Sequence, residues 1–526
     1  MIHAGISAAG PGDPIALCGQ GLAAEAKGDV VAAEWAYRHA VAAAPDCRPA
    51  LRALGSLLAR AGRPDALAPW RVLAALDADD ADAANNLGVL LRAAGDQKGA
   101  QAAYAKALAA QPSHRDAPYN LGRALLHEGE AVEAAGWLRQ AAAIVPDDWT
   151  RHHALGQALQ QAGQLEDAEA AYVRALGCAP GSVASLNNLA STQQAQGRLH
   201  EALATYDRAL GCEPEHPDIR YNRALLLLLM GDHAQGWIEH EWRWRAPGFT
   251  APRRRFSVKQ WDGGELPGAT LLVHAEQGLG DTIQFIRYAA AARARVGRLV
   301  VEAPACLVPL LQGVAGVDAV IGLGATPPAI DAHVPMLTLP LLVGHDAALA
   351  TPYLQAPAAR VAHWREILGS AGAGVRPVIG VAWAGNPKHG NDRNRSIRLG
   401  ALAPLVRDPR WRWISLQVPP RPDDVGAVGL GDHLREVGHM LGDMAETAAC
   451  VSALDAVVAV DTAVAHVAAA TGTKVALFVP FAPDWRWGPA GTTTHWYPSL
   501  RLFRQQVPGC WDQPLNNIWK YLKNGE

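Results

Sequence analysis

The sequence predicts a helical solenoid followed by a two-part α/β region, and three observations lead to this fold class. Glycines recur about every 34 residues through the first half of the chain. In the second half, apolar strands alternate with glycine turns and helices, in two separate series. The 526 residues are 50% hydrophobic and 18% charged, which excludes a disordered or collagenous protein and leaves room for several cores.

The first half repeats with the period of tetratricopeptide arrays. The repeat glycines are 34 residues apart, with a single spacing of 33, and are Gly28, Gly62, Gly95, Gly129, Gly163, Gly197 and Gly231. In most units a small residue such as Ala100 follows, then an aromatic such as Tyr104 and a closing proline such as Pro112. Glycine can end the first helix of a pair, the small residue lets the second helix approach it, and proline stops the second helix. We therefore expect about seven helical pairs between residues 14 and 244.

The second repeat departs most from this pattern. Arg71 stands where an aromatic is usual, and Asp79 stands where proline is usual. The local packing of this repeat is therefore the hardest to predict.

Helical pairs of this kind wind into a superhelix whose concave groove binds protein. Four units carry an asparagine two residues before the Leu-Gly glycine or its substitute, at Asn86, Asn120, Asn188 and Asn222. A carboxamide both donates and accepts hydrogen bonds, so a ladder of asparagines can hold a peptide backbone. The pattern resembles the asparagine ladder of nucleocytoplasmic O-GlcNAc transferase, which also carries repeats ahead of a catalytic region. Asparagine that only caps local backbone is the alternative, and both interpretations stay open.

The helical period breaks after Gly231. Residues 236–244, GWIEHEWRW, hold three tryptophans, and a link rich in proline and arginine follows. We expect the tryptophans to seal the last repeat against the next domain, with a ligand platform as the alternative. The predicted domains are a repeat array at 14–244 and two α/β halves at 245–357 and 376–526.

The α/β region shows two series of strands. In the first, the strand ATLLVHA precedes EQGLGDTIQFIRYAAAARAR, a glycine turn into a helix, and apolar runs at 298–303, 319–321 and 337–342 continue the alternation. The second series has strands at 377–383, 411–417, 454–461 and 474–480. Two Rossmann-like halves are predicted, and such sheets bind ligands at the carboxyl ends of their strands.

Four blocks stand in order along this region: EQGLGDTIQFIRY, AWAGNPKHGNDRNRSIRL, DTAVAHVAAATG, and DWRWG with WYPSLRLFRQ. Together they closely resemble tetratricopeptide-containing glycosyltransferases related to the heptosyltransferases of family nine, over nearly all of residues 231–511. The resemblance implies a GT-B fold and inversion at the anomeric carbon, without a metal ion or other cofactor. It also implies a nucleotide-sugar donor held mainly by the C-terminal half and an acceptor held mainly by the N-terminal half.

Asp281 is the candidate general base. Gly278 and Gly280 allow a tight turn, which also contains Gln277, and place the carboxylate at the edge of the cleft. The resemblance implies that the matching acid of the family accepts the hydroxyl proton. Alternatively, Asp281 caps the following helix with Gln284 as its capping-box partner, and the helix dipole keeps it ionised. An ionised carboxylate can serve in both roles.

A basic loop in the C-terminal half is expected to balance the charge of the leaving diphosphate. Arg395 is the first candidate because arginine clamps phosphate oxygens bidentately, and Lys388 is the second. Arg393 and Ser396 lie in the same loop, and Gln417 is a candidate nucleotide contact at the end of a strand. A solvated basic loop is the alternative.

Residues 461–466, DTAVAH, repeat the strand-to-helix pattern. The free N–H groups at a helix start suit phosphate, and Thr462 adds a hydroxyl donor. The family usually has glycine where Ala463 stands, and the extra methyl group limits how closely a phosphate approaches. Asp461 is expected to cap the helix and orient a sugar hydroxyl, whereas His466 suits a core position as well as a ligand contact.

The sequence therefore predicts an inverting glycosyltransferase that modifies a protein hydroxyl of Ser or Thr, with the repeats recruiting the acceptor. A lipid-linked sugar would not need seven helical pairs. Flagellin-modifying transferases of bacteria share this arrangement, so flagellin is the first acceptor we expect. The alternatives are a heptosyltransferase-like step in surface-polysaccharide assembly and an inactive scaffold. A further polar loop, DWR at 484–486, lies near the expected cleft.

Charge and composition restrict the partners and the compartment. The net charge of -3 gives no footprint for nucleic acid. Seven scattered cysteines, none in a CxxC motif, favour a reducing cytoplasm over a disulfide framework or a zinc site. We expect no signal peptide and no membrane insertion, because the longest apolar run, LLLLLM, is too short to span a bilayer. A homo-oligomer is compatible with the sequence.

Overall fold

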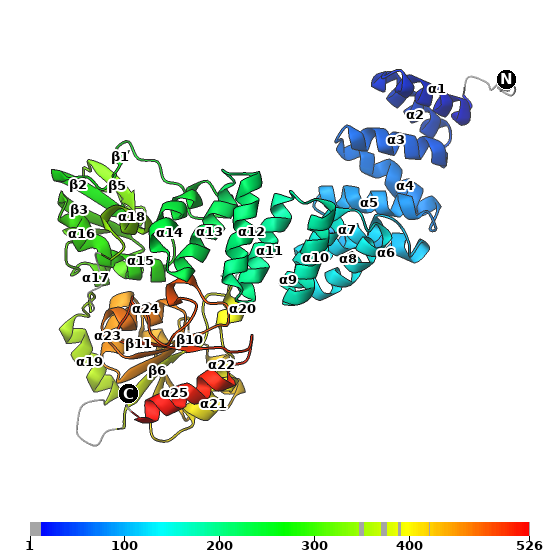
Figure 1. Ribbon diagram of the computed structural model, residues 1–526. Helices are drawn as coiled ribbons and strands as arrows, with labels where there is room; N and C mark the ends of the chain where they lie inside the picture. The colour runs from blue at the N-terminus through cyan, green and yellow to red at the C-terminus, as the bar shows by residue number, and fades with distance from the viewer. Residues whose placement is uncertain (1–11, 347–351, 370–375, 388–390, 420, 525–526) are drawn as a thin grey trace. The chain divides into compact units, whose positions relative to one another are not determined.

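The computed structural model describes residues 12–346, 352–369, 376–387, 391–419 and 421–524 (Figure 1). The chain divides into two compact units, Met1–Gln193 and Gln194–Glu526, and each is described by itself. Tandem helices fill the first unit, and the second contains further helices and two parallel sheets. This is the predicted order of an α-solenoid followed by α/β layers.

The first unit is a succession of antiparallel helical pairs with short connections. Its helices are α1 (Pro14–Ala26), α2 (Val30–Ala43), α3 (Arg48–Arg60), η1 (Pro64–Ala66), α4 (Leu67–Leu76), α5 (Ala81–Ala93), α6 (Gln97–Ala110), α7 (Ala117–Glu128), α8 (Ala131–Ile144), α9 (Trp149–Gln161), α10 (Leu165–Cys178) and α11 (Val183–Ala195), of which the last two residues belong to the second unit.

The roles expected for the repeat residues are confirmed. All seven repeat glycines have φ between 66° and 89°, a left-handed conformation that side chains disfavour. Ala100 is fully buried between the helices of its pair, and α6 ends two residues before Pro112. A Cβ atom on Gly88 would lie 2.5 Å from the ring of Tyr104, so the Leu-Gly glycine makes room for the aromatic side chain of the second helix.

The second repeat keeps this packing with a shifted residue. The expectation that the repeat lacks its aromatic, because Arg71 stands at that position, is wrong. Trp70 is 3% exposed, and a Cβ atom on Gly55 would lie 2.7 Å from its indole nitrogen. The single glycine spacing of 33 moves the aromatic by one residue, which a strict count of 34 misses.

The last helices of the solenoid belong to the second unit and pack onto its sheets. They are α12 (Leu199–Cys212), α13 (Pro217–Met230), α14 (His233–His240) and η2 (Glu241–Trp244). Trp237 is buried, with its ring edge-to-face against Phe285 at 5.6 Å and Trp485 at 5.4 Å. The prediction that the tryptophans seal the last repeat is thus confirmed.

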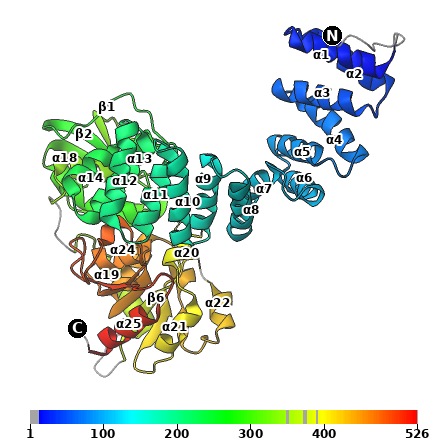
Figure 2. The ribbon, with the colours of Figure 1, turned by 45° about the vertical axis from the view of Figure 1, so that its right-hand side comes forward.

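The first sheet is parallel, with the strand order β1-β5-β2-β3-β4. The apolar run at 337–342 forms helices, and the strand lies just before it. The elements are β1 (Lys259–Gln260), β2 (Leu266–His274), α15 (Leu279–Phe285), η3 (Ile286–Tyr288), α16 (Ala289–Arg293), β3 (Val296–Ala303), η4 (Ala305–Leu307), α17 (Val308–Leu311), β4 (Ala319–Gly322), β5 (Ala332–Pro335), η5 (Met336–Thr338) and α18 (Leu339–Val343). In Figures 1 and 2, α13 and α14 lie beside this sheet, and α14 contacts α18.

The second sheet is also parallel, with the order β11-β10-β9-β6-β7-β8. Its four predicted strands are confirmed as β6, β7, β9 and β10. The elements are α19 (Ala358–Leu368), β6 (Val378–Ala382), α20 (Asp392–Arg395), α21 (Leu399–Val406), β7 (Arg412–Ser415), α22 (Pro422–Ala427), β8 (Leu434–Glu436), η6 (Gly438–Met440), α23 (Met444–Ser452), β9 (Ala456–Val460), α24 (Ala463–Ala470), β10 (Val475–Val479), η7 (Trp485–Trp487), β11 (Leu500–Arg504) and α25 (Asp512–Asn524).

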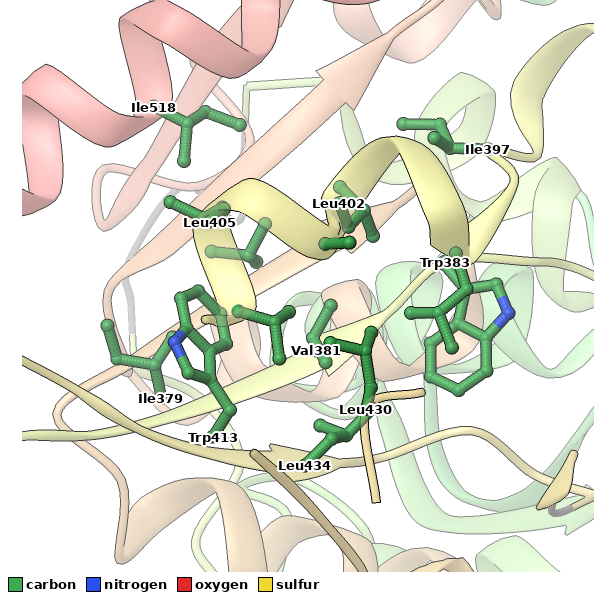
Figure 3. Packing of buried hydrophobic residues seen from close by; sticks show 14 of the residues in the cluster. Ile379, Val381, Trp383, Ile397, Leu402, Leu405, Trp413, Leu430, Leu434 and Ile518 are labelled. Carbon is green, nitrogen blue, oxygen red and sulfur yellow. The ribbon is translucent and has the colours of Figure 1, made fainter. Parts of the chain in front are cut away.

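An apolar core fixes the second sheet under its helices. Figure 3 shows Trp383 and Trp413 lining the layer between the strands and α21, with Leu402 from α21 and Ile518 from α25. All four side chains are at most 2% exposed. The carboxyl ends of the strands are therefore held on a rigid support. The domain boundaries near 244 and between 357 and 376 stay predictions.

Candidate active site

The second sheet reverses its strand order between β6 and β9. Strands β6, β7 and β8 run to one side of this point, and β9, β10 and β11 run to the other. Open α/β sheets bind ligands in the crevice outside such a point, at the carboxyl ends of the strands. The segments that follow β6 and β9, which begin at Trp383 and Asp461, therefore border the crevice of this half.

Thr462 lies at this crevice with an unpaired hydroxyl. It is the residue before α24, and its Oγ1 is buried without a hydrogen-bond partner among the described residues. The first N–H groups of a helix have no acceptor within the helix, and those of α24 begin at Ala463. A hydroxyl and backbone amides at one helix end are donors suited to phosphate oxygens.

Arg395 borders the other side of the crevice. A Cβ atom on Gly385, just after β6, would lie 2.7 Å from Arg395 Nη2, so the guanidinium lies close to the backbone at this place. Asp392 Oδ1 accepts a hydrogen bond from Arg395 Nε at 3.3 Å. Ser396 Oγ accepts one from the Gly385 N–H at 3.0 Å, so its hydroxyl positions the loop.

Two further predicted residues of this loop have different outcomes. The side chain of Arg393 is exposed on α20 and interacts with other residues of the protein. Lys388 lies outside the described residues. Whether either side chain meets a nucleotide stays a prediction.

Gln417 does not point a free amide into the crevice. Its side chain is buried and forms two hydrogen bonds with the backbone of Ala384, accepting at 3.1 Å and donating at 3.0 Å. Both polar ends of the amide are thus used to tie the loop after β6 to the end of β7. The amide of Gln417 therefore shapes the crevice, and a contact between Gln417 and a nucleotide stays a prediction.

Asp461 and His466 form a buried pair beside Thr462. Asp461 Oδ1 lies 3.7 Å from His466 Nε2, and His466 Nδ1 shares a hydrogen bond of 2.8 Å with the hydroxyl of Tyr497. Burial alone would raise the pKa of Asp461, but His466, Trp487 and Arg486 together bring it below its usual range. The side chain of Asp461 does not cap α24, so the expected capping role is wrong, and His466 occupies a core position.

The first sheet has the same kind of switch point, between β2 and β5. Strands β3 and β4 lie on one side of β2, and β5 and β1 lie on the other. Here the protein fills the crevice itself. Glu276, just after β2, is 2% exposed in its side chain and accepts a hydrogen bond at 3.0 Å from the N–H of Leu337, just after β5.

Arg243 of the last solenoid turn pairs with this carboxylate. Its fully buried guanidinium lies 3.1 Å from Glu276 Oε2. Burial raises the pKa of the Glu276 carboxyl to about 7, although Arg243 acts to lower it. The sequence did not single out either residue, although Glu276 opens the block EQGLGDTIQFIRY and Arg243 lies in GWIEHEWRW, because their pairing depends on the fold.

Asp281 follows in the same turn and faces the second half. Its Oδ2 accepts a hydrogen bond of 2.9 Å from the Gly278 N–H, and its Oδ1 pairs with the Nη2 of Arg486. Gly278 is the N-cap of α15, and Asp281, the third residue of the helix, accepts the Gly278 N–H as in a capping box. The alternative that Asp281 caps the helix is therefore confirmed in part, whereas its placement as the N-cap with Gln284 as partner is wrong. Gln284 instead accepts a hydrogen bond from Arg486 Nε at 2.6 Å.

Arg486 joins the two halves at this place. Besides Asp281 it pairs with Asp484 at 2.8 Å. Burial would lower the pKa of its guanidinium, but Asp484, Asp281 and Asp461 raise it above its usual range, so Arg486 stays charged. A Cβ atom on Gly280 would lie 3.0 Å from the ring of His466, which explains why glycine is needed there. The sequence indicated the polar DWR loop at 484–486, which contains Arg486. It did not indicate that Arg486 pairs with Asp281.

The asparagines of the repeats are half-buried, and several have neighbours within the solenoid. Asn120 donates to Asn85 of the preceding repeat at 2.9 Å. Asn188 accepts from Asn187 at 3.4 Å and shares a hydrogen bond with Tyr172. Asn222 also has a partner of its own. The asparagine ladder stays a prediction.

Two searches of the described residues gave no site. No group of three or more His, Cys, Asp or Glu side chains in the described ranges is arranged to hold a metal ion. Within the same ranges, no helix is long and apolar enough to cross a membrane.

Comparisons with known proteins agree with both parts of the chain. Residues 86–148, 153–212 and 187–236 match the tetratricopeptide repeat family. Residues 438–496 match glycosyltransferase family 9 (heptosyltransferase), and this segment carries Asp461, Thr462 and Arg486. Of the four sequence blocks, DTAVAHVAAATG and DWRWG lie inside this matched segment.

The chain is also similar to Protein FlbA of Caulobacter vibrioides, with 25% identity over 339 residues. The alignment covers 58% of this chain and 55% of that protein, so the chain spans about half the length of the curated relative that it matches.

Three similar solved structures each cover between 31% and 43% of this chain. The MamA protein has 25% identity and a TM-score of 0.30, covering 31% of this chain and 91% of its own. YrrB, described as a TPR protein with an unusual peptide-binding site, has 22% identity and a TM-score of 0.34, covering 36% and 98%. A tetratricopeptide repeat protein from Parabacteroides merdae has 16% identity and a TM-score of 0.35, covering 43% and 91%.

Proposed function

We propose that this protein is an inverting, metal-independent glycosyltransferase of GT-B type that moves a sugar from a nucleotide-sugar to a Ser or Thr hydroxyl of a protein. One observation carries the proposal above the others. The crevice of the second sheet presents the unpaired Thr462 hydroxyl and the start of α24, with Arg395 near its other border. These groups are hydrogen-bond donors, and Arg395 is positively charged. A diphosphate offers acceptor oxygens and the opposite charge.

The donor diphosphate is proposed to lie against α24. Its oxygens take the N–H groups from Ala463 onward and the Thr462 hydroxyl, while Arg395 balances the charge that grows as the sugar leaves. Ala463 in place of glycine keeps the phosphate slightly farther from the helix axis. Gln417 and Ser396 keep the loop after β6 in place, through their hydrogen bonds to Ala384 and Gly385.

The transfer step needs a base on the side of the acceptor. The hydroxyl oxygen of the acceptor forms a bond to the anomeric carbon, and the bond from that carbon to the diphosphate oxygen breaks with its electron pair. Asp281 takes the hydroxyl proton. Arg486 pairs with this carboxylate and holds it at the place where the two halves meet.

The acceptor is proposed to be a protein held by the repeats, in the cytoplasm. Solenoid grooves of this type bind extended protein segments. Flagellin is the acceptor that the resemblance favours, and the half-buried asparagines are proposed contacts for its backbone.

Turnover of a panel of nucleotide-sugars by the purified chain tests this function. With flagellin as acceptor, we expect one donor to add a single sugar mass to the acceptor and release its nucleoside diphosphate. Release of the nucleotide only with a saccharide acceptor would favour surface-polysaccharide assembly instead. Binding of no nucleotide-sugar at all would leave a scaffold and reject the proposal.

A further inference from the structure

Residues at the end of the solenoid form hydrogen bonds with the turn that carries Asp281. Arg243 lies in η2 and is fully buried. Its Nη2 donates to Glu276 Oε1 at 3.1 Å and to Thr338 Oγ1 at 2.9 Å, and its Nη1 donates to Glu241 Oε1 at 2.6 Å. Thr338 also donates to Glu241 at 2.9 Å. Every partner of this guanidinium is therefore fixed in place, on two sides of the switch point of the first sheet.

A second contact holds the next residue of the same turn. The side chain of Gln277 shares a hydrogen bond with the hydroxyl of Tyr221, which lies on α13. The same helix also packs against η7, the segment that contains Arg486. Residues of the last helical pair thus touch both loops that meet at Asp281.

A simple joint between two domains does not require this network. Apolar side chains of similar volume seal an interface as well as a buried ion pair does, and Trp237 already seals this one. The Arg243 guanidinium instead donates directed hydrogen bonds to Glu276, Thr338 and Glu241, which fix one orientation, and its loss would leave the buried Glu276 carboxylate without a cationic partner. The orientation that it fixes is that of residues 276–281.

We infer that Arg243 and Tyr221 are positioning residues, and that the last helical pair of the solenoid holds the turn of Asp281 in its reactive orientation. This inference rests on the proposed function. The seventh helical pair belongs to the catalytic machinery, whereas the earlier pairs recruit the acceptor. Neither residue touches the reacting atoms, so both act through Glu276 and Gln277.

Kinetics and hydrogen exchange of the full-length protein test this inference. In Arg243→Gln we expect kcat to fall at least about 10-fold, with the Kd for the nucleotide-sugar within 2-fold of wild type. Amide exchange of peptides from residues 276–285 should rise, while that of β9 and β10 stays unchanged. Glu276→Gln should give the same pattern, and the double variant should be no slower than either single variant, because the two residues act as one unit.

Two further variants keep the test decisive. Arg220→Gln is the matched control, because Arg220 lies in the same helical pair but forms its ion pair with Glu239, so the kcat of this variant should equal that of wild type. Tyr221→Phe removes only the hydroxyl, and we expect a 3- to 10-fold lower kcat with an unchanged melting temperature. This variant decides the question if Arg243→Gln does not fold.

Unchanged kcat and unchanged exchange at 276–285 in Tyr221→Phe and in the folded Glu276→Gln would overturn the inference. The exchange measurement needs no activity, so it separates this outcome from a failure of the proposed function. If the wild type transferred no sugar but amide exchange at 276–285 still rose in these variants, the proposed function would be rejected. The inference that the last helical pair holds this turn would stand.

Discussion

The two sheets of the second unit have the same kind of crevice, but different side chains border the two crevices. In the first sheet, Arg243 and Glu276 fill the switch point with a buried ion pair. In the second sheet, the switch point is bordered by the unpaired hydroxyl of Thr462 and by the loop at Gly385. At the second crevice, the Thr462 hydroxyl is a donor that no described residue of the protein uses.

This difference teaches where a charged ligand can be accommodated. A diphosphate at the first switch point would meet the Glu276 carboxylate, which already occupies the N–H of Leu337. At the second, it meets a helix start, a hydroxyl and a guanidinium. The geometry of the two crevices therefore supports the proposal that the nucleotide binds in the second half, which is also what the family resemblance implies.

The largest expected effect comes from cutting the solenoid at two places. Removal of residues 12–193 should leave a folded protein with cooperative thermal unfolding, because the second compact unit begins at Gln194. Removal of residues 12–230 also deletes α13, which packs against α14 and η7, and should abolish cooperative unfolding. Circular dichroism melts of both truncations check this expectation. Equal unfolding of the two proteins would contradict the assignment of the last pair to the catalytic unit.

The next largest effect is expected at the base. Asp281→Asn removes the proton acceptor, while Arg486 keeps Asp484 as its partner, so turnover should fall by about 100-fold or more. The Kd of the nucleotide-sugar should change little, because the donor lies at the other switch point. Single-turnover rates at saturating donor and acceptor give the measurement. A variant with near-normal turnover would leave Asp281 as a residue that only joins the two halves.

A smaller effect is expected at the open crevice. Thr462→Val keeps the shape of the side chain but removes its hydroxyl, so we expect the nucleotide-sugar Kd to rise roughly 10-fold. The free energy of unfolding should not fall, because the lost hydroxyl has no partner in the folded protein.

Thr471→Val is the matched control for this change. Thr471 lies at the other end of α24 and donates to the carbonyl of Ala468 at 3.0 Å. This variant should lose about 1 kcal/mol of stability and bind the nucleotide-sugar normally. If Thr462→Val bound the nucleotide-sugar normally and Thr471→Val bound it more weakly, the open crevice would not be the nucleotide site.

The sequence predicted the fold better than the site, for a physical reason. Repeat glycines and apolar strands obey local rules of helix ends and alternation, so their period reveals them. Trp70 escaped because one deleted residue shifts that period. Asp281 and Thr462 were found because glycine turns and helix starts are also local signals.

The partners of these residues are not local. Arg486 lies 205 residues from Asp281, and Arg243 lies 33 residues from Glu276. Neither separation corresponds to a turn of helix or a strand register, so only the fold pairs them. For the same reason, the place of Gln417 at a strand end did not show that its amide forms hydrogen bonds with the backbone of Ala384 at both ends.

The central claim is that the crevice of the second sheet holds the diphosphate of a nucleotide-sugar, and calorimetric titration with nucleoside diphosphates tests it most directly. The titration compares the wild type with Arg395→Ala and with Arg398→Ala, an exposed arginine three residues away that serves as control. We expect one nucleoside diphosphate to bind the wild type and the control equally, and to bind Arg395→Ala about 10- to 100-fold more weakly. Equal affinity for all three proteins, or no binding to the wild type, would contradict the account.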